Sequence, residues 1–196
     1  FAGIGKASAT MLSDGRRELV YLTIAGADDI PIDRNSDVYR NLKQALFRFG
    51  DPHQPLEIET RELLLIVLEA QVKLLPNFHW ETVEPQIRAA LLDAFSFRNR
   101  ELGQDVLLSD AMSVVQGISG VDYVDIDTLT AFGDAELSDA GDLRNLAGLD
   151  QVQRTPELKA RIPILDSRVE NDQLRPAQLA ILTPDVPQTL LLTERR

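Results

Sequence analysis

The two histidines are the obvious candidates for acid–base or metal chemistry, and neither lies in a pattern that such chemistry requires. His53 lies in Asp51-Pro-His-Gln-Pro55, and His79 precedes Trp80. A histidine zinc site needs a second ligand at helical spacing, as in HExxH, and a catalytic base needs a nucleophile and an orienting group. Neither histidine has such companions in the sequence. We therefore predict that His53 lies in a loop and that His79 is packed or partly solvated, with no catalytic role for either.

Three aspartates, Asp122, Asp125 and Asp127, offer a second possible site, for a cation. An EF-hand loop needs oxygen ligands at alternate positions, a glycine at the sixth position and a glutamate at the twelfth. The sequence that follows Asp125 breaks this pattern immediately. Successive side chains of a strand also alternate between its two faces, which separates Asp122 from Asp125. We therefore predict a solvated strand edge that its charge protects from aggregation, and no metal site.

The start of the chain, Gly3-Ile-Gly5-Lys6, superficially resembles a phosphate-binding loop. It lacks the four-residue gap between the glycines, and no strand precedes it. We therefore expect a flexible start without phosphate binding. The sequence thus predicts no catalytic, cofactor-binding or metal-binding residue.

Composition excludes several further classes of function. The chain of 196 residues has no cysteine, which rules out disulfides, cysteine zinc sites and thiol catalysis and fits synthesis in the cytoplasm. Its formal charge of −11 argues against binding to a nucleic acid backbone. The longest apolar run, 63–68, is far shorter than the roughly 20 residues of a membrane-spanning helix. Because the first residue is Phe1, we expect an excised or processed piece of a longer protein.

Periodicity predicts the elements that carry these residues, beginning with a strand–helix–strand module over 1–60. A β-branched and aromatic run predicts a strand over 18–25, and 56–60 predicts a second one. Between them, Ser36 and Asp37 are the candidate N-caps of a helix, and Gly50 is expected to end that helix in a left-handed conformation. The spacing of its apolar residues predicts one buried face, made of Val38, Leu42, Ala45, Leu46 and Phe49.

A second α/β module is predicted over 61–132. It comprises a strand over 63–75, a helix over 81–97, a short strand over 106–108, a helix capped by Ser109 that ends at Gln116, and a strand over 121–127. Phe78 and Trp80 flank the start of the first helix. They could anchor a partner, but a hydrophobic staple is the favoured reading.

The remainder is predicted to be an extended arm or long loop over 133–176, with at most a short helix around 155–160. Two C-terminal strands, over 177–183 and 188–193, are expected to return to a sheet already built. The predicted fold class is therefore α+β: two small mixed-sheet modules, an extended arm and a C-terminal strand pair.

Several segments share their order and spacing with one family. They are Asp37–Leu42, Phe49–Leu56, Ile87–Phe97, Leu102–Gln104, Leu108–Asp127 and Arg175–Leu182. In this respect residues 15–132 and 174–193 resemble the C-terminal part of the baseplate J-like proteins, the wedge component of contractile phage tails and contractile injection systems. Residues 133–173 depart from the pattern.

The resemblance implies a structural, non-enzymatic component of an assembled particle. Its expected partners are other baseplate subunits, further copies of itself, and hub and sheath-proximal proteins, with no nucleic acid, cofactor or membrane insertion. An alternative from another class is a binding or glycan-active domain that uses paired acids such as Glu81 and Glu84. Nothing in the sequence places those two carboxylates across a sugar, as glycoside hydrolysis requires.

Overall fold

The computed structural model describes residues 1–13, 15–51, 53–133 and 158–195. Pro52, most of the predicted arm, and the part of the predicted short helix before residue 158 lie outside the described residues. The described part is α+β, with three α-helices and small mixed sheets, which confirms the predicted class.

The chain divides into two units, and each is built from several segments. Unit 1 comprises 1–62, 101–104 and 164–179, and unit 2 comprises 63–100, 105–163 and 180–196. The chain therefore passes between the units repeatedly. The predicted division into modules 1–60 and 61–132 stays a prediction.

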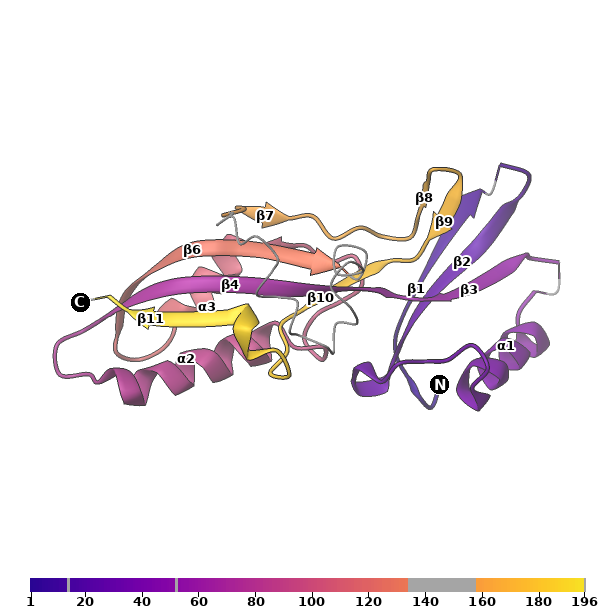
Figure 1. Ribbon diagram of the computed structural model, residues 1–196. Coiled ribbons are helices and arrows are strands. Elements are labelled where there is room, and N and C mark those ends of the chain that lie inside the picture. Colours follow the sequence, from indigo (N-terminus) through magenta and orange to yellow (C-terminus); the bar gives the residue numbers. More distant parts are fainter. Residues whose placement is uncertain (14, 52, 134–157, 196) are drawn as a thin grey trace. The chain divides into compact units, whose positions relative to one another are not determined.

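Unit 1 is built on a three-stranded sheet with the order β1-β2-β3 (Figure 1). The strands are β1 (Ile4–Ser13), β2 (Glu18–Gly26) and β3 (Leu56–Thr60). β1 is antiparallel to β2, and β3 is parallel to β2. A short 3-10 helix, η1 (Ala27–Asp29), follows β2. The predicted strands over 18–25 and 56–60 are confirmed, whereas the predicted flexible start is wrong because it forms the first strand.

The helix α1 (Asp37–Phe49) packs on one face of this sheet. Ser36 caps it as predicted, since its side chain accepts a hydrogen bond from the Tyr39 N–H. Leu42 is buried with Ile24 and Ile58 at the centre of the contact. Gly50 follows the helix in an extended conformation (φ −86°, ψ −175°), so the predicted left-handed cap is wrong.

A β-hairpin within unit 1 is made by β8 (Arg168–Glu170) and β9 (Gln173–Arg175). Asn171 and Asp172 connect the two strands, with φ values of 50° and 58°. Two central residues with positive φ are the mark of a type I′ turn, in which asparagine and aspartate are favoured. This part of the predicted arm therefore contains strands.

Unit 2 is centred on the long strand β4 (Glu62–Leu74), which agrees with the strand predicted over 63–75. β6 (Val121–Gly133) pairs with β4 antiparallel, and β11 (Leu190–Glu194) pairs with it parallel. β10 (Gln178–Ile181), which the chain enters from unit 1, also pairs with β4. The two C-terminal strands therefore return to an existing sheet, as predicted. The 3-10 helix η3 (Pro187–Thr189) precedes β11.

Two helices, α2 (Trp80–Ala94) and α3 (Leu108–Gln116), complete unit 2 together with the strand pair β5 (Val106–Leu107) and β7 (Arg161–Ile162). Their buried residues include Ile87, Leu91 and Val115, which add to a core that contains Leu68 and Val72 of β4. Burial of each such side chain stabilises the fold by roughly 1.5–3 kcal/mol.

The predicted cap of α3 is wrong. Ser109 is the second residue of the helix, and Leu107 occupies the N-cap position without a side-chain hydrogen bond. The reason is that β5 runs directly into α3, which leaves no loop residue between strand and helix.

Candidate protein interaction surface

The outward side of α1 carries an exposed aromatic residue among cations. We call Arg40, Lys43, Gln44, Phe47 and Arg48 the α1 outer face. Phe47 is 61% exposed. Because residues three, four and seven apart share one side of a helix, Arg40, Lys43 and Gln44 lie on the same side as Phe47.

The opposite side of α1 fixes this orientation. Leu42 is buried, and Tyr39 and Leu46 are partly buried against the sheet. The Tyr39 hydroxyl donates a hydrogen bond to the Ile58 carbonyl oxygen at 3.0 Å and so ties the helix to β3. The α1 outer face is therefore directed away from the sheet by contacts on the other side of the helix.

The charge of α1 contrasts with that of the whole chain. α1 contains one acid, Asp37, and three bases, so its net charge is +2, whereas the whole chain carries −11. Arg40 pairs with Asp37, while Lys43 and Arg48 make no ion pair with any described residue. The Arg48 guanidinium lies 5.4 Å from the centre of the Phe49 ring. α1 thus presents local positive charge beside aromatic rings.

Two hollows adjoin Phe47. The residues of the α1 outer face line one of about 470 Å³. The other, of about 180 Å³, is lined by residues of three successive elements: Val20, Leu46, Phe47, Gly50, Asp51, Gln54 and Leu56. An exposed aromatic side chain beside hollows and arginine is typical of residues that anchor a protein interface.

The sequence prediction for α1 missed this surface. It placed Phe49 on the buried face, but Phe49 is 80% exposed, so that assignment is wrong. Phe49 is the last residue of the helix. A signal was present in Phe47, which falls off the apolar stripe and four residues after Lys43.

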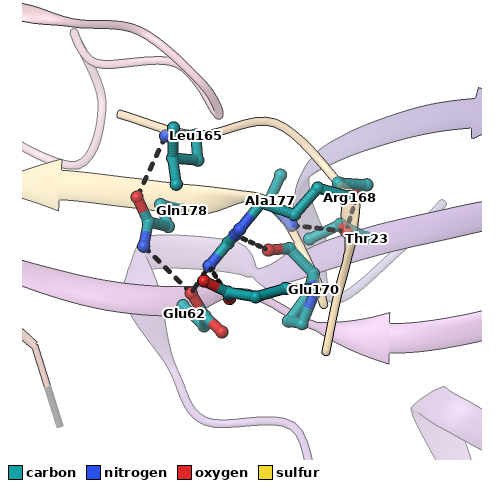
Figure 2. Close-up of polar contacts among 9 residues, drawn as sticks. Thr23, Glu62, Leu165, Arg168, Glu170, Ala177 and Gln178 are labelled. Atoms are coloured by element: carbon teal, nitrogen blue, oxygen red, sulfur yellow. Dashed lines mark hydrogen bonds and ion pairs between the residues drawn. The ribbon is translucent and has the colours of Figure 1, made fainter. Parts of the chain in front are cut away.

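Buried and half-buried polar residues fasten the segment 164–179 within unit 1 (Figure 2). Figure 2 shows Arg168 and Gln178 converging on Glu62. Glu62 Oε2 accepts hydrogen bonds from Arg168 Nη2 at 3.4 Å and from Gln178 Nε2 at 3.0 Å. Gln178 Oε1 in turn accepts one from the Leu165 N–H at 2.9 Å. Arg168 also pairs with Glu170 at 3.0 Å. The donors and acceptors come from both ends of the segment.

A pair of buried hydroxyl groups also holds the segment 164–179. Thr23 Oγ1 is 2.8 Å from Ser167 Oγ and accepts a hydrogen bond from the Ala177 N–H at 3.0 Å. Thr23 is 0% exposed and Ser167 is 5% exposed. Because a buried donor without a partner costs about 1–3 kcal/mol, this triad fixes where the segment sits.

Burial changes the acidity of one residue in each unit. In unit 1, burial raises the pKa of Tyr21 from 10.0 to about 12, with a further contribution from the charge of Glu57. In unit 2, burial lowers the pKa of the Arg100 guanidinium, and Asp110 and Asp105 oppose that shift. Arg100 donates a hydrogen bond to the Asp105 carbonyl oxygen at 2.7 Å and lies 5.7 Å from the centre of the Phe95 ring.

The histidines and the aspartates remain apart from one another. His53 is exposed in the turn between α1 and β3, as predicted, whereas His79 is exposed at the N-cap of α2. Asp122, Asp125 and Asp127 are exposed on β6. Arg195 pairs with Asp125 at 2.8 Å, and Gln71 donates a hydrogen bond to Asp127 at 2.9 Å. No group of three His, Asp or Glu suited to a metal ion occurs among the described residues.

The acids of the glycan alternative lie three residues apart on α2, and Glu84 forms an ion pair with Arg88. Neighbouring positions on one helix do not set two carboxylates on opposite sides of a sugar. Near the start of the same helix, the Phe78 ring lies against Gly120, where an added Cβ would come within 2.3 Å of it. The proposed staple with the helix itself stays a prediction.

Within the described residues, no helix combines the length and the apolar character that crossing a membrane requires.

Comparison with protein families gives one match. Residues 1–59 match the model of the Baseplate J-like central domain, and no curated protein matches the chain. The matched residues include β1, β2, α1 and most of β3. The match is to the central domain, so the predicted resemblance to the C-terminal part is not confirmed and stays a prediction. The family indicates a structural role in a phage baseplate and contacts with other baseplate proteins, and it is generally non-enzymatic. Residues 1–59 are therefore similar to the central domain of baseplate J-like proteins, and this match supports a baseplate J-like protein.

Proposed function

We propose that this chain is a structural wedge subunit of a contractile tail or contractile injection system. It assembles around the hub through contacts with other baseplate subunits, further copies of itself and sheath-proximal proteins. The match of residues 1–59 to the Baseplate J-like central domain is the observation that carries the proposal.

The α1 outer face supports the proposal because it lies within the matched residues and has the character of a protein contact. Phe47 offers apolar area, and Lys43 and Arg48 offer charges without an ion pair to any described residue. An acidic partner surface would be attracted to these cations, and such complementarity raises association rates and selects partners. We therefore assign the α1 outer face to a contact with an acidic baseplate protein.

Co-purification with the proteins encoded beside this chain tests the assignment. We expect the wild-type chain to retain baseplate proteins in a pull-down and Lys43→Glu/Phe47→Glu to retain far less of at least one of them. Arg98→Glu is the control for a charge reversal at an exposed cation elsewhere, since Arg98 is 80% exposed at its side chain and lies in unit 2. If all three chains retained the same amount of baseplate proteins, the role assigned to α1 would be contradicted. If none of them retained any baseplate protein, the proposed function would be contradicted.

The glycan-active alternative receives no support from the geometry. Its test is direct: hydrolysis of a glycan that is lost in Glu84→Gln would revive it.

A further inference from the structure

We propose that the free edge of β1 pairs with β1 of a second copy of this chain. The two strands run antiparallel around a twofold axis at Ala9, so that two three-stranded sheets join into one of six strands. This inference rests on the proposed function, because it names the surface through which one copy meets another.

The backbone of β1 offers hydrogen-bonding groups along its outer side. Among the described residues, β1 is an end strand of its sheet and pairs with β2 alone. From Ala7 to Ser13, no backbone hydrogen bond links β1 to any described residue outside β2. Every second N–H and C=O of an edge strand points away from its neighbour, and an added strand satisfies these groups. The chemistry of the edge therefore specifies a strand as its occupant.

β1 also lacks the features that normally keep edge strands apart. Such strands are commonly short, or carry proline, inward charges or bulges. β1 is ten residues long, contains no proline, and has Lys6 as its one charged residue. Its register irregularity lies near its start, between Ile4 and Lys6. The seven residues from Ala7 to Ser13 are uncharged and regularly paired.

A second copy fits this edge because antiparallel pairing makes a strand complementary to itself. In an antiparallel pair, directly opposed residues point to the same face of the sheet. Two identical strands can therefore oppose only residues that are an even number of positions apart, and this places the twofold axis at a residue and not between two residues. An axis at Ala9 sets Ala7 opposite Met11 of the partner. Ala7 and Ala9 are exposed and small, so their side chains leave room for the second strand.

Electrostatic repulsion between copies is weak in this part of the chain. Residues 1–62 contain eight Lys or Arg and ten Asp or Glu, a net charge of −2, whereas the whole chain carries −11. The remaining −9 therefore belongs to residues 63–196. Unit 1 as a whole, which adds 101–104 and 164–179, carries −4, so two copies approach through unit 1 with less of the repulsion that a high net charge creates.

Single-cysteine variants provide a sharp test because the chain has no cysteine of its own. We would make Ala7→Cys, Ser8→Cys, Ala9→Cys, Thr10→Cys and Met11→Cys and measure disulfide-linked dimer after mild oxidation. Opposed residues lie about 4.5–5.5 Å apart at Cα, within the range that a disulfide spans. For a cysteine at position 7 or 11, two positions from the axis, the cysteines of the two copies lie about four residues apart along the strands, or about 14 Å.

The inference predicts one maximum of cross-linking at Ala9, with a steep fall on both sides. Equal cross-linking at positions 7, 9 and 11 would indicate a parallel arrangement and would overturn it. No cross-linking at any of the five positions would overturn it as well.

A second experiment measures self-association in the uncross-linked chain. We expect sedimentation equilibrium to give a wild-type dimer that Ala7→Lys/Ala9→Lys weakens at least tenfold, because like charges then face each other across the axis. Asn35→Lys/Asn41→Lys makes the same charge change at exposed positions outside the α1 outer face and should leave the dimer intact. Circular dichroism checks that all three chains are folded.

A wild-type chain that is monomeric at every concentration, or a dimer equally stable in all three chains, would overturn the inference. Neither result touches the proposed function, because co-purification with other baseplate proteins is measured separately.

Discussion

Replacing Thr23 with valine tests whether the hydroxyl triad holds the segment 164–179 in place. Valine has nearly the shape of threonine but has no hydroxyl. The Ala177 N–H then loses its acceptor, and Ser167 Oγ loses its partner at 2.8 Å. Thr23 and Ala177 are both 0% exposed, so water does not replace the lost contacts.

The expected loss follows from the groups left unsatisfied. One buried backbone donor without a partner costs about 1–3 kcal/mol, and the more exposed Ser167 hydroxyl can regain a partner at lower cost. We therefore expect Thr23→Val to lower the free energy of unfolding by about 2 kcal/mol. Thr23→Ser keeps the hydroxyl and loses one methyl group, for which we expect about 1 kcal/mol.

Urea denaturation measures the global loss, and hydrogen exchange of the Ala177 amide measures the local one. The reasoning predicts that this amide exchanges about 30-fold faster in Thr23→Val, which corresponds to 2 kcal/mol. A double-mutant cycle with Ser167→Ala should show non-additive losses, since the two hydroxyls are in contact. Unchanged exchange at Ala177 together with a stability within 0.5 kcal/mol of wild type would refute the role assigned to Thr23.

Three further perturbations test other parts of the account. Because the pKa of Tyr21 is raised to about 12, the folded chain keeps a proton that the unfolded chain releases above about pH 10. The wild type should therefore lose up to about 3 kcal/mol relative to Tyr21→Phe between pH 10 and 12, and parallel pH profiles would contradict this. Leu42→Ala should lower the free energy of unfolding by about 2–5 kcal/mol, whereas exposed Asn41→Ala should change it by less than about 0.5, as measured in urea. Gly120→Ala forces alanine to φ +98° and places its Cβ 2.3 Å from the Phe78 ring, for which we expect a loss of about 1–3 kcal/mol in the same assay. Phe78→Ala should remove only the steric part of that loss.

Elements with strong periodicity could be predicted from the sequence. The helix α1 and the strand β4 follow apolar spacings of 3.6 and 2, and Ser36 gave a correct cap. β1 was missed because its alternation is carried by small residues such as Ala7, Ser8 and Ala9, which give little contrast in hydropathy. The β8–β9 hairpin did have a local signal in Asn171-Asp172, which the prediction did not use.

The contact between the Thr23 and Ser167 hydroxyls could not be predicted in the same way. Thr23 and Ser167 are 144 positions apart in the chain, and no local pattern marks either as the partner of the other. Charge and exposure on α1 depend likewise on which residues the sheet covers. Sequence spacing identifies a helix and its apolar stripe, but tertiary packing decides whether Phe47 and Phe49 face solvent.

The central claim is that this chain is a structural part of a baseplate. Deleting its gene, restoring it from a plasmid and counting complete particles by electron microscopy tests that claim most directly. The account predicts few or no complete baseplates after deletion and a return to wild-type numbers on restoration. Normal baseplates in normal numbers without this chain would contradict it.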